Sequence, residues 1–379
     1  MRRGVSLLAV VGMAVVALSG AVLGAGGGPS TAVRGVAGGQ TTATAAQAAP
    51  APAPTTSITL APVEAMALPL PGCPPPPPKP GTGPGVPYTP PRLVPEDQLP
   101  AAQPPPAISV GTAAVEGKGM WIWKYRQSEG GDASAIVARA SAAGLRQLWV
   151  RVGDSQDGFY GASVLADLVP KAHKAGLSVI GWGFPYLFDP AADAAWSIEA
   201  VRWRGPGGAR LDGFSPDIEL STEGVVLTER RITVYLGLLR PAGPDTVLAA
   251  TVYRPTDKLW NGTYPYRAIA PYVDAFAPMV YWGCTEPGEA AAQAIERLSS
   301  LKPVHVIGQG YDAGPGGGRA GAPSAQETLR FLDVARRGGA AGASFWVWQS
   351  IDGEQWDALA GYNWPLTAAT PPPARRAGA

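Results

Sequence analysis

Two carboxylic acids two positions apart, Asp217 and Glu219, are the residues of this sequence with the clearest chemical potential. They end the segment Asp212–Glu219, the last part of a predicted β-strand, so alternation places Ser215, Asp217 and Glu219 on one face, with neighbours about 6.6 Å apart along the strand. Repulsion and burial would raise the pKa of one acid and leave the other ionised. Hydrolysis of a glycosidic bond needs such a pair.

A structural explanation of the same pair is a solvated or arginine-bridged couple of acids at the start of a loop. Pro216 lies between them, lacks an N–H group and is poorly suited to a central strand. We therefore expect a local irregularity where this strand ends.

Eight strand-like runs, separated by amphipathic helical stretches, must position these acids. Each run is short, mostly apolar and rich in β-branched or aromatic residues, as in parallel strands that are buried on both faces. The runs are Gly119–Lys124, Gln147–Gly153, Ser178–Phe184, Arg210–Glu219, Thr246–Tyr253, Ala275–Trp282, Val304–Gly310 and Ala343–Gln349.

The helical stretches between them include Asp132–Ala143, Val164–Ala175, Glu229–Leu239, Ala290–Leu301 and Ala325–Arg337. Glycines suited to helix ends follow three of them, at Gly144, Gly176 and Gly338. Eight such units in about 250 residues predict an α/β fold, the (β/α)8 TIM barrel, whose chemistry lies at the C-terminal ends of the strands.

A doubly wound open sheet is the competing α/β architecture. It would usually carry a phosphate-binding glycine turn after its first strand, but Lys124–Ser128 follow here, so dinucleotide binding is excluded.

Aromatic residues with a polar atom are abundant, with 12 Trp and 12 Tyr against 7 Phe. Clefts that bind sugars combine aromatic walls with hydrogen-bonding groups, although core packing is the alternative for any single Trp. The aromatic residues predicted to line a cleft are Trp182, Tyr186, Tyr281, Trp346 and Trp348, and the polar residues at strand ends are Asp154, Gln309 and Asp312.

The segment at the fourth strand resembles the chitinase-type family 18 glycoside hydrolases, whose signature there is Asp-x-x-Asp-x-Asp-x-Glu. Asp212, Asp217 and Glu219 match it, and Ser215 replaces the middle Asp. The resemblance implies a TIM-barrel glycosidase with Glu219 as proton donor and Asp217 orienting an acetamido group of the substrate. Asp212 and Ser215 would support them.

Two other segments resemble the same family more loosely. Met279–Tyr281 is similar to its Met-x-Tyr element, with Trp282 where an Asp is usual, and Gly342–Trp346 is similar to its last strand. Its third-strand Ser-x-Gly-Gly element is absent, and Gly181–Gly183 stands there. An Asp-x-Glu on a barrel strand also resembles the family 25 muramidases, which cleave peptidoglycan.

Composition excludes several other functions. A net charge of +1 removes the electrostatic basis for binding nucleic acid. His, Asp and Glu do not cluster at metal-ligand spacing, so we expect neither a metal nor another cofactor. No Gly-x-Ser-x-Gly elbow supports a serine triad. His173 and His305 are expected to be structural.

The chain is predicted to divide into four parts. Residues 1–25 have the charged, apolar and small-residue order of a secretion signal, with an uncleaved membrane anchor as the alternative. Residues 26–110 form an Ala/Thr/Pro-rich disordered linker that would hold the domain away from a membrane or wall, residues 111–366 the barrel and 367–379 a disordered tail. Cys73 could pair with Cys284 or with another chain.

These features predict a secreted glycoside hydrolase that acts on a polysaccharide, such as chitin or peptidoglycan with N-acetylated sugars, and indicate no protein partner. The alternative is a catalytically inactive barrel that binds cell-wall or capsular glycans. The loss of the middle acid at Ser215 favours that alternative.

Overall fold

A closed barrel of eight parallel strands forms the centre of the protein, whose computed structural model describes residues 92–314 and 318–365. The strand order is β1-β9-β8-β7-β6-β5-β4-β2, and pairing of β2 with β1 closes the ring. The predicted TIM barrel is therefore confirmed, with one barrel strand in each predicted run. The strands are β1 (Gly117–Ile122), β2 (Gln147–Asp154), β4 (Ser178–Phe184), β5 (Gly213–Pro216), β6 (Val247–Tyr253), β7 (Ala275–Met279), β8 (His305–Gln309) and β9 (Gly342–Trp346).

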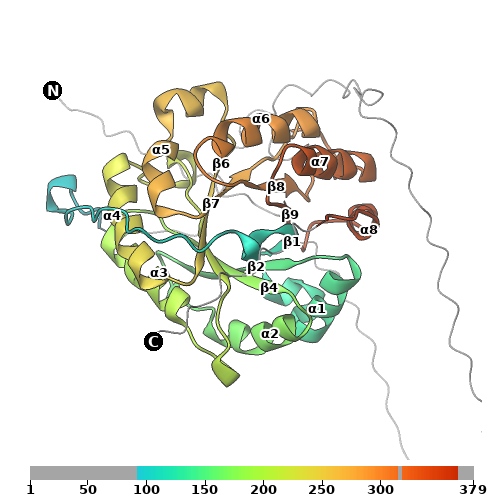
Figure 1. Cartoon of the computed structure of the whole chain (residues 1–379), viewed down its shortest axis with the longest axis horizontal. Coiled ribbons are helices and arrows are strands. Elements are labelled where there is room, and N and C mark those ends of the chain that lie inside the picture. Colours follow the sequence, from blue (N-terminus) through green and yellow to red (C-terminus); the bar gives the residue numbers. More distant parts are fainter. Residues whose placement is uncertain (1–91, 315–317, 366–379) are drawn as a thin grey trace, which may run out of the picture.

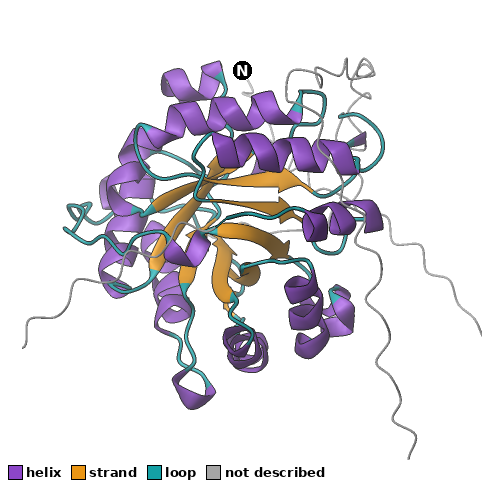
Figure 2. Ribbon diagram, turned by 45° about the vertical axis from the view of Figure 1, so that its right-hand side comes forward, coloured by secondary structure: helices purple, strands orange, loops and turns teal. Residues whose placement is uncertain are grey.

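Helices surround the barrel, as Figures 1 and 2 show. The short strand β3 (Gly158–Phe159) pairs antiparallel with the end of β2 and lies outside the alternation. Gly144 and Gly176 have positive φ after their helices, whereas Gly339, one residue beyond the predicted Gly338, has it after α7. The helices are α1 (Ala133–Ala142), α2 (Ala162–Lys174), α3 (Pro190–Arg202), α4 (Glu229–Leu239), α5 (Tyr266–Ile269), α6 (Pro287–Ser299), α7 (Ala325–Arg337) and α8 (Gly353–Gly361).

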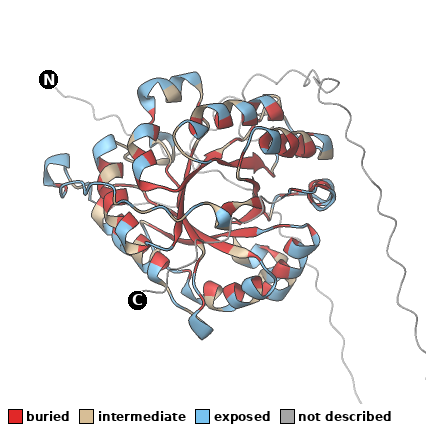
Figure 3. Ribbon diagram, in the orientation of Figure 1, coloured by how far each residue is buried: buried red, intermediate tan, exposed pale blue. Residues whose placement is uncertain are grey.

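The buried residues form two cores, an outer one between strands and helices and an inner one inside the barrel. Figure 3 shows buried strands and helices whose outward sides are exposed. Inside the barrel, the indole rings of Trp121 and Trp149 stack with their centroids 4.7 Å apart. The small side chains Ala249, Ala275 and Ala277 belong to the same inner core on β6 and β7. Wide and narrow side chains from different strands thus fill the barrel together.

The N-terminal end of the barrel is closed by the turn Ala113–Val115. Val115 is fully buried in the inner core, and its carbonyl oxygen lies 2.7 Å from Nδ1 of His305. The other ring nitrogen of His305 lies 2.9 Å from the Ser344 hydroxyl. Burial lowers the pKa of His305 to about 4, so this histidine is a neutral structural residue.

An extended arm precedes this turn and belongs to the folded domain. The N–H of Val94 donates to the carbonyl of Phe188, and the Tyr272 hydroxyl donates to the carbonyl of Gln103. Buried Arg231 on α4 also donates to the carbonyl of Val94. Residues 92–110 were expected in the linker, but these backbone contacts attach them to the barrel.

The predicted signal 1–25, the linker up to residue 91, Cys73 and the tail 367–379 lie outside the described residues. Cys284, between β7 and α6, takes part in a disulfide. Within residues 92–314 and 318–365, none of the helices has the length and apolar character needed to cross a bilayer.

A buried ion pair joins the end of α4 to the strand β7. Arg240 and Asp274 lie 2.8 Å apart, and the Asp274 carboxylate also accepts the N–H groups of Val110 and Leu248. We expect Asp274→Ala to lower the free energy of unfolding by about 3–5 kcal/mol in urea titrations, because it leaves a buried guanidinium uncompensated.

The control for this prediction is Asp167→Ala, which removes the exposed Lys171–Asp167 pair on α2. That change should lower the free energy of unfolding by about 0–1 kcal/mol. Equal losses in the two variants would contradict a stabilising role for the buried pair.

Candidate functional site

The end of β5 directs polar side chains into the barrel. Phe214 and Ile218 pack in the outer core, so the alternate residues Ser215, Asp217 and Glu219 face the other way. Ser215 is fully buried, Asp217 is 6% exposed and Glu219 is half-buried. The two acids therefore lie on the inward face at the C-terminal end of their strand, where such barrels carry their chemistry.

Ser215 repairs an interruption that Pro216 causes in the sheet. The N–H of Ile218 donates to the carbonyl of Thr251, and the equivalent donor two residues earlier would be the N–H that Pro216 lacks. The Ser215 hydroxyl donates to the Ala249 carbonyl instead, at 2.5 Å, and lies 2.7 Å from the Thr251 hydroxyl. The Ser215 hydroxyl therefore bonds the neighbouring strand β6. It does not interact with Asp217, as an acid at this position would in the family that the sequence resembles.

Burial dominates the electrostatics of the two acids. It raises the pKa of Asp217 to about 7, with Arg151 lowering that pKa and Glu223 raising it. The pKa of Glu219 is raised well above its usual value by burial, then by the charges of Asp217 and Glu223, against a hydrogen bond from Tyr253. Oδ1 of Asp217 is buried without a hydrogen-bond partner among the described residues. Burial thus favours the protonated form of both carboxyl groups.

Arg151 on β2 supplies the positive charge near Asp217. Its Nη2 donates to Oδ2 of Asp154 at 2.8 Å, and its guanidinium lies over the ring of Trp182, 5.4 Å from the centroid. Asp154 was predicted to contact sugar, but its Oδ1 accepts two backbone N–H groups, those of Gln156 and Asp157. Asp154 therefore builds the turn after β2 and holds Arg151 in place.

Several of the predicted aromatic residues meet beside the acids. Trp346 is half-buried, and its ring lies edge-on to that of Trp182 at 5.3 Å and stacks with that of Trp123 at 6.1 Å. Tyr281, whose ring lies 5.5 Å from that of Tyr311, has a pKa raised by burial, then by Tyr311 and by both acids. Trp123, Trp346 and Tyr281 all pack against the inner core, which includes Trp182.

Two other aromatic predictions have different outcomes. Tyr186, after β4, is half-buried, and its pKa is raised by burial and by Asp154 and lowered by Arg151, which places it beside that pair. Trp348 lies apart: its ring packs edge-on against Trp356 of α8 at 4.9 Å, and it is 4% exposed. The chain turns outward after β9, so Trp348 belongs to the outer core and not to the site.

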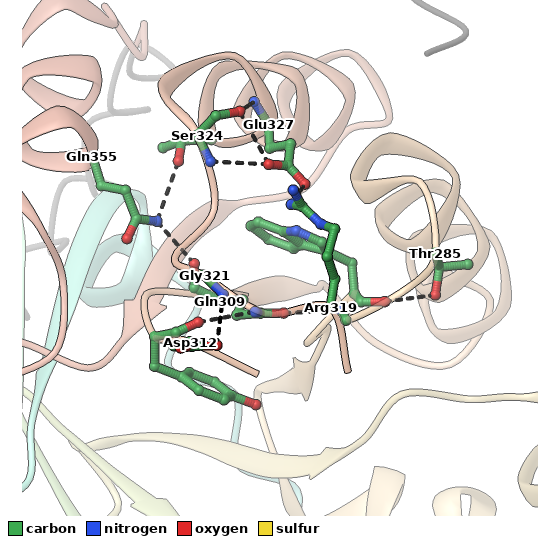
Figure 4. A network of polar contacts seen from close by, with 12 residues as sticks. Thr285, Gln309, Asp312, Arg319, Gly321, Ser324, Glu327 and Gln355 are labelled. Carbon is green, nitrogen blue, oxygen red and sulfur yellow. Dashed lines mark hydrogen bonds and ion pairs between the residues drawn. The ribbon is translucent and has the colours of Figure 1, made fainter. Parts of the chain in front are cut away.

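Gln309 joins loops at the same end of the barrel, as Figure 4 shows. Its Oε1 accepts the N–H of Gly283, its Nε2 donates to the carbonyl of Tyr311, and its own carbonyl accepts from Gln355. Asp312 accepts the N–H groups of Gly314 and Gly321. Their side chains hydrogen-bond within the protein and hold these loops, and their contact with sugar stays a prediction.

Asp212 lies at the opposite end of β5 from the two acids. Its Oδ2 accepts the N–H of Val179 and lies 2.8 Å from Nε2 of His173. Asp212 therefore links β5 to the start of β4 and to α2. It was predicted to support Asp217 and Glu219, and the contacts that it makes stabilise the strand that carries them.

Sequence reasoning missed three functional candidates, Arg151, Glu223 and Tyr253. Arg151 and Tyr253 could have been found, because they lie near the ends of β2 and β6, where chemistry was expected. Glu223 lies in the 3-10 turn Ser221–Glu223 after β5, and only the fold brings it to the acids. Among the described residues, no group of three or more His, Cys, Asp or Glu side chains is arranged to hold a metal.

Comparison with known proteins finds similar shapes only among solved structures. No family model matches the chain, and no curated protein matches it. A chitinase from Chromobacterium violaceum has 12% identity and a TM-score of 0.49 over 65% of this chain and 98% of that one. A family GH18 chitinase from Cycas revoluta has 12% identity and a TM-score of 0.47, covering 64% and 98%. An endo-1,4-beta-D-mannanase from Thermotoga petrophila has the same identity and TM-score, covering 61% and 88%.

Proposed function

We propose that the protein is a secreted glycoside hydrolase in which Glu219 is the general acid and Asp217 assists it. One observation carries the proposal: two carboxyl groups lie on the inward side of the chain directly after β5, and burial raises the pKa of both, that of Glu219 well above its ordinary value. A carboxyl that keeps its proton near neutral pH can protonate a leaving oxygen.

The reaction consumes one water molecule. Glu219 gives its proton to the glycosidic oxygen while the bond from that oxygen to the anomeric carbon breaks, and the bonding electrons stay on the leaving oxygen. Water supplies a hydroxyl group to the anomeric carbon, and its remaining proton returns to Glu219. The carboxyl group is then ready for another cycle.

A polysaccharide with N-acetylated sugars is the proposed substrate class. Oδ1 of Asp217 is a buried acceptor without a partner among the described residues, and the amide N–H of an acetamido group would satisfy it. Half-buried Trp346, among other indole rings, offers an apolar surface for the C–H face of a sugar. Wall or capsule glycans would be the source of such chains for an exported enzyme.

A barrel that binds glycans without cleaving them is the second candidate. The observation that favours it is the engagement of Ser215 with Ala249 and Thr251, which leaves Asp217 without the acidic neighbour found in the resembling family. Binding of glycan fragments by the full chain, with no cleavage of chitin, peptidoglycan or neutral polysaccharides, would select this candidate.

Glu219→Gln is the direct test of the proposed reaction. We expect kcat on the susceptible glycan to fall by about 10²–10⁴-fold, with little change in binding, because the amide keeps the shape but has no acidic proton to give. Release of reducing ends and mass spectrometry of products would measure turnover. Glu199→Gln, an exposed change on α3, is the control, and unchanged turnover in Glu219→Gln would remove the hypothesis.

Trp346→Leu tests the aromatic wall. Loss of the indole should raise KM about 10-fold, which corresponds to about 1.4 kcal/mol of binding free energy, and leave kcat nearly unchanged. The matched control is Trp203→Leu, which changes a half-buried indole at the end of α3. A KM that does not respond to Trp346→Leu would show that sugars do not rest on this ring.

Arg151→Met tests the charge that opposes protonation of Asp217. The Arg151 guanidinium lowers the pKa of Asp217 from what burial alone would produce, so its loss should move that pKa above about 7 and extend the protonated form to higher pH. A ¹³C NMR titration of the carboxyl would measure the shift, and Arg151→Lys should retain most of the effect of the charge. A lower pKa in Arg151→Met would contradict this account.

A further inference from the structure

Asp193 on α3 is a buried acid that the proposed reaction does not use. Its side chain accepts three hydrogen bonds, from the Ser155 hydroxyl at 2.5 Å, the Leu187 N–H at 2.8 Å and the Trp196 indole N–H at 3.2 Å. The residue is 2% exposed, and removal of a carboxyl group from water has a free-energy cost that such contacts offset. The partners of Asp193 therefore indicate what the fold requires of it.

The contacts of Asp193 suit an ionised carboxylate. Burial raises the pKa of Asp193 to about 6, against hydrogen bonds from Ser155, Trp196 and Leu187 that lower it. An ionised carboxylate accepts hydrogen bonds at both oxygens, whereas a protonated one has a donor at one of them. Three donors converge on these two oxygens, so the form that predominates at neutral pH is also the form that the donors fit.

Helix capping does not explain Asp193. The Asp189 carboxylate already caps α3, where it accepts two backbone N–H groups of the first turn at 3.1 and 3.2 Å. Asp193 lies one turn further along the helix, and two of its three donors, Ser155 and Leu187, belong to loops. These loops follow β2 and β4 at the C-terminal end of the barrel. Asp193 therefore serves the loops and not the end of the helix.

Ser155 extends the contact from Asp193 to Tyr186. The Ser155 hydroxyl has one proton, which it donates to Asp193, and its oxygen accepts the N–H of Tyr186 at 2.6 Å. The carbonyl of Phe184, 3.5 Å from the hydroxyl, is a longer alternative for that proton and also accepts the Ser155 N–H at 3.1 Å. Because the shorter bond directs the proton to Asp193, a lone pair of the hydroxyl is left to face Tyr186.

Leu187 has a backbone conformation that leucine rarely adopts. Its φ is 60°, in the left-handed region. Its N–H donates to Asp193, its carbonyl accepts from Arg231 at 3.0 Å, and its side chain is fully buried. Contacts at both backbone groups thus hold an unfavourable conformation, and such residues concentrate where function needs a particular backbone path. Here the left-handed residue sets the direction of the chain directly after Tyr186.

Tyr186 lies where three loops meet. It follows β4, its N–H is bonded to Ser155 after β2, and its carbonyl accepts the N–H of Val226 after β5 at 2.9 Å. Its ring lies over Gly224, with Cε1 3.7 Å from the position that a Cβ atom would take there. The charge of Arg151, which also acts on Asp217, lowers the pKa of the Tyr186 phenol against the effect of burial. Tyr186 is therefore held between the loops that surround the candidate site.

We propose that Asp193 is a positioning residue that presents Tyr186 to the substrate. Through Ser155 it fixes the N–H of Tyr186, and through Leu187 it fixes the turn that follows, so the phenol ring is in place before a glycan binds. A ligand that meets a prearranged ring does not have to order it, which improves affinity. Contact between Tyr186 and a sugar rests on the proposed function, whereas the control of Tyr186 by Asp193 does not.

Ser155→Ala in the full chain tests the proposal without substrate. It removes the link from Asp193 to the Tyr186 N–H and leaves the bond to Leu187. In protein labelled with 3-fluorotyrosine, the ¹⁹F NMR signal of Tyr186, assigned by its loss in Tyr186→Phe, should move or broaden. Asp193→Asn should change the same signal more, because its amide brings an NH2 donor against either Ser155 or the Leu187 N–H. The signal of Tyr362, which follows α8, should stay in place.

Asp189→Asn is the matched control for Asp193→Asn. It changes a carboxyl group to an amide at the start of the same helix, and Asn caps helices about as well as Asp, so the Tyr186 signal should not move. A role for Asp193 limited to the stability of α3 would lower the melting temperature of Asp193→Asn and leave the Tyr186 signal of Ser155→Ala at its wild-type position.

The consequence for binding can be measured with an oligosaccharide of N-acetylglucosamine. Ser155→Ala should raise its Kd about 5-fold in isothermal titration calorimetry, the equivalent of one ordinary hydrogen bond. In a Tyr186→Ala background the same change should raise the Kd by less than half as much, because substitutions that act through one contact are not additive.

Two results would overturn the proposal: a Tyr186 signal that is unchanged in both Ser155→Ala and Asp193→Asn, or an equal loss of binding from Ser155→Ala with and without the Tyr186 ring. A wild-type protein that does not bind the oligosaccharide would show that the proposed substrate class is wrong. The NMR comparison needs no substrate, so it decides whether Asp193 controls Tyr186 even if Glu219→Gln shows that the proposed hydrolysis is wrong.

Discussion

The removal of two carboxyl groups from water is the constraint on which the site depends. A barrel strand alternates between a face packed under helices and a face inside the ring, and β5 uses Phe214 and Ile218 for the first and its acids for the second. Burial is the largest cause of the raised pKa values of Asp217 and Glu219. The fold itself thus favours the protonated form of these carboxyl groups, and neighbouring charges raise or lower their pKa values further.

The inner core supports the strand ends that carry these acids. The stacked indoles of Trp121 and Trp149 fill the barrel beneath the site, with Ala249, Ala275 and Ala277 as the narrow side chains of the same core. Close-packed interiors have low compressibility. The strand ends that carry the acids, Arg151 and Tyr253 therefore rest on a core that resists compression.

Periodicity and strand count were sufficient to predict the barrel, because each buried parallel strand leaves a short apolar run in the sequence. Alternation alone predicted that Ser215, Asp217 and Glu219 share one face, and the packing of Phe214 and Ile218 in the outer core identifies that face as the inward one. Trp348 could not be assigned in this way, because its position depends on where the chain leaves β9 and packs against Trp356. Glu223 was missed for a similar reason, since a 3-10 turn of three residues carries no periodic signal.

Ser215 and Pro216 are best understood as one unit. Pro216 removes a backbone donor from the ladder between β5 and β6, and the Ser215 hydroxyl supplies a replacement to the Ala249 carbonyl. An ionised Asp at position 215 would have no donor to give that carbonyl and would leave a buried acceptor unsatisfied, a cost of about 1–3 kcal/mol. The departure from the acidic signature is thus coupled to the proline beside it.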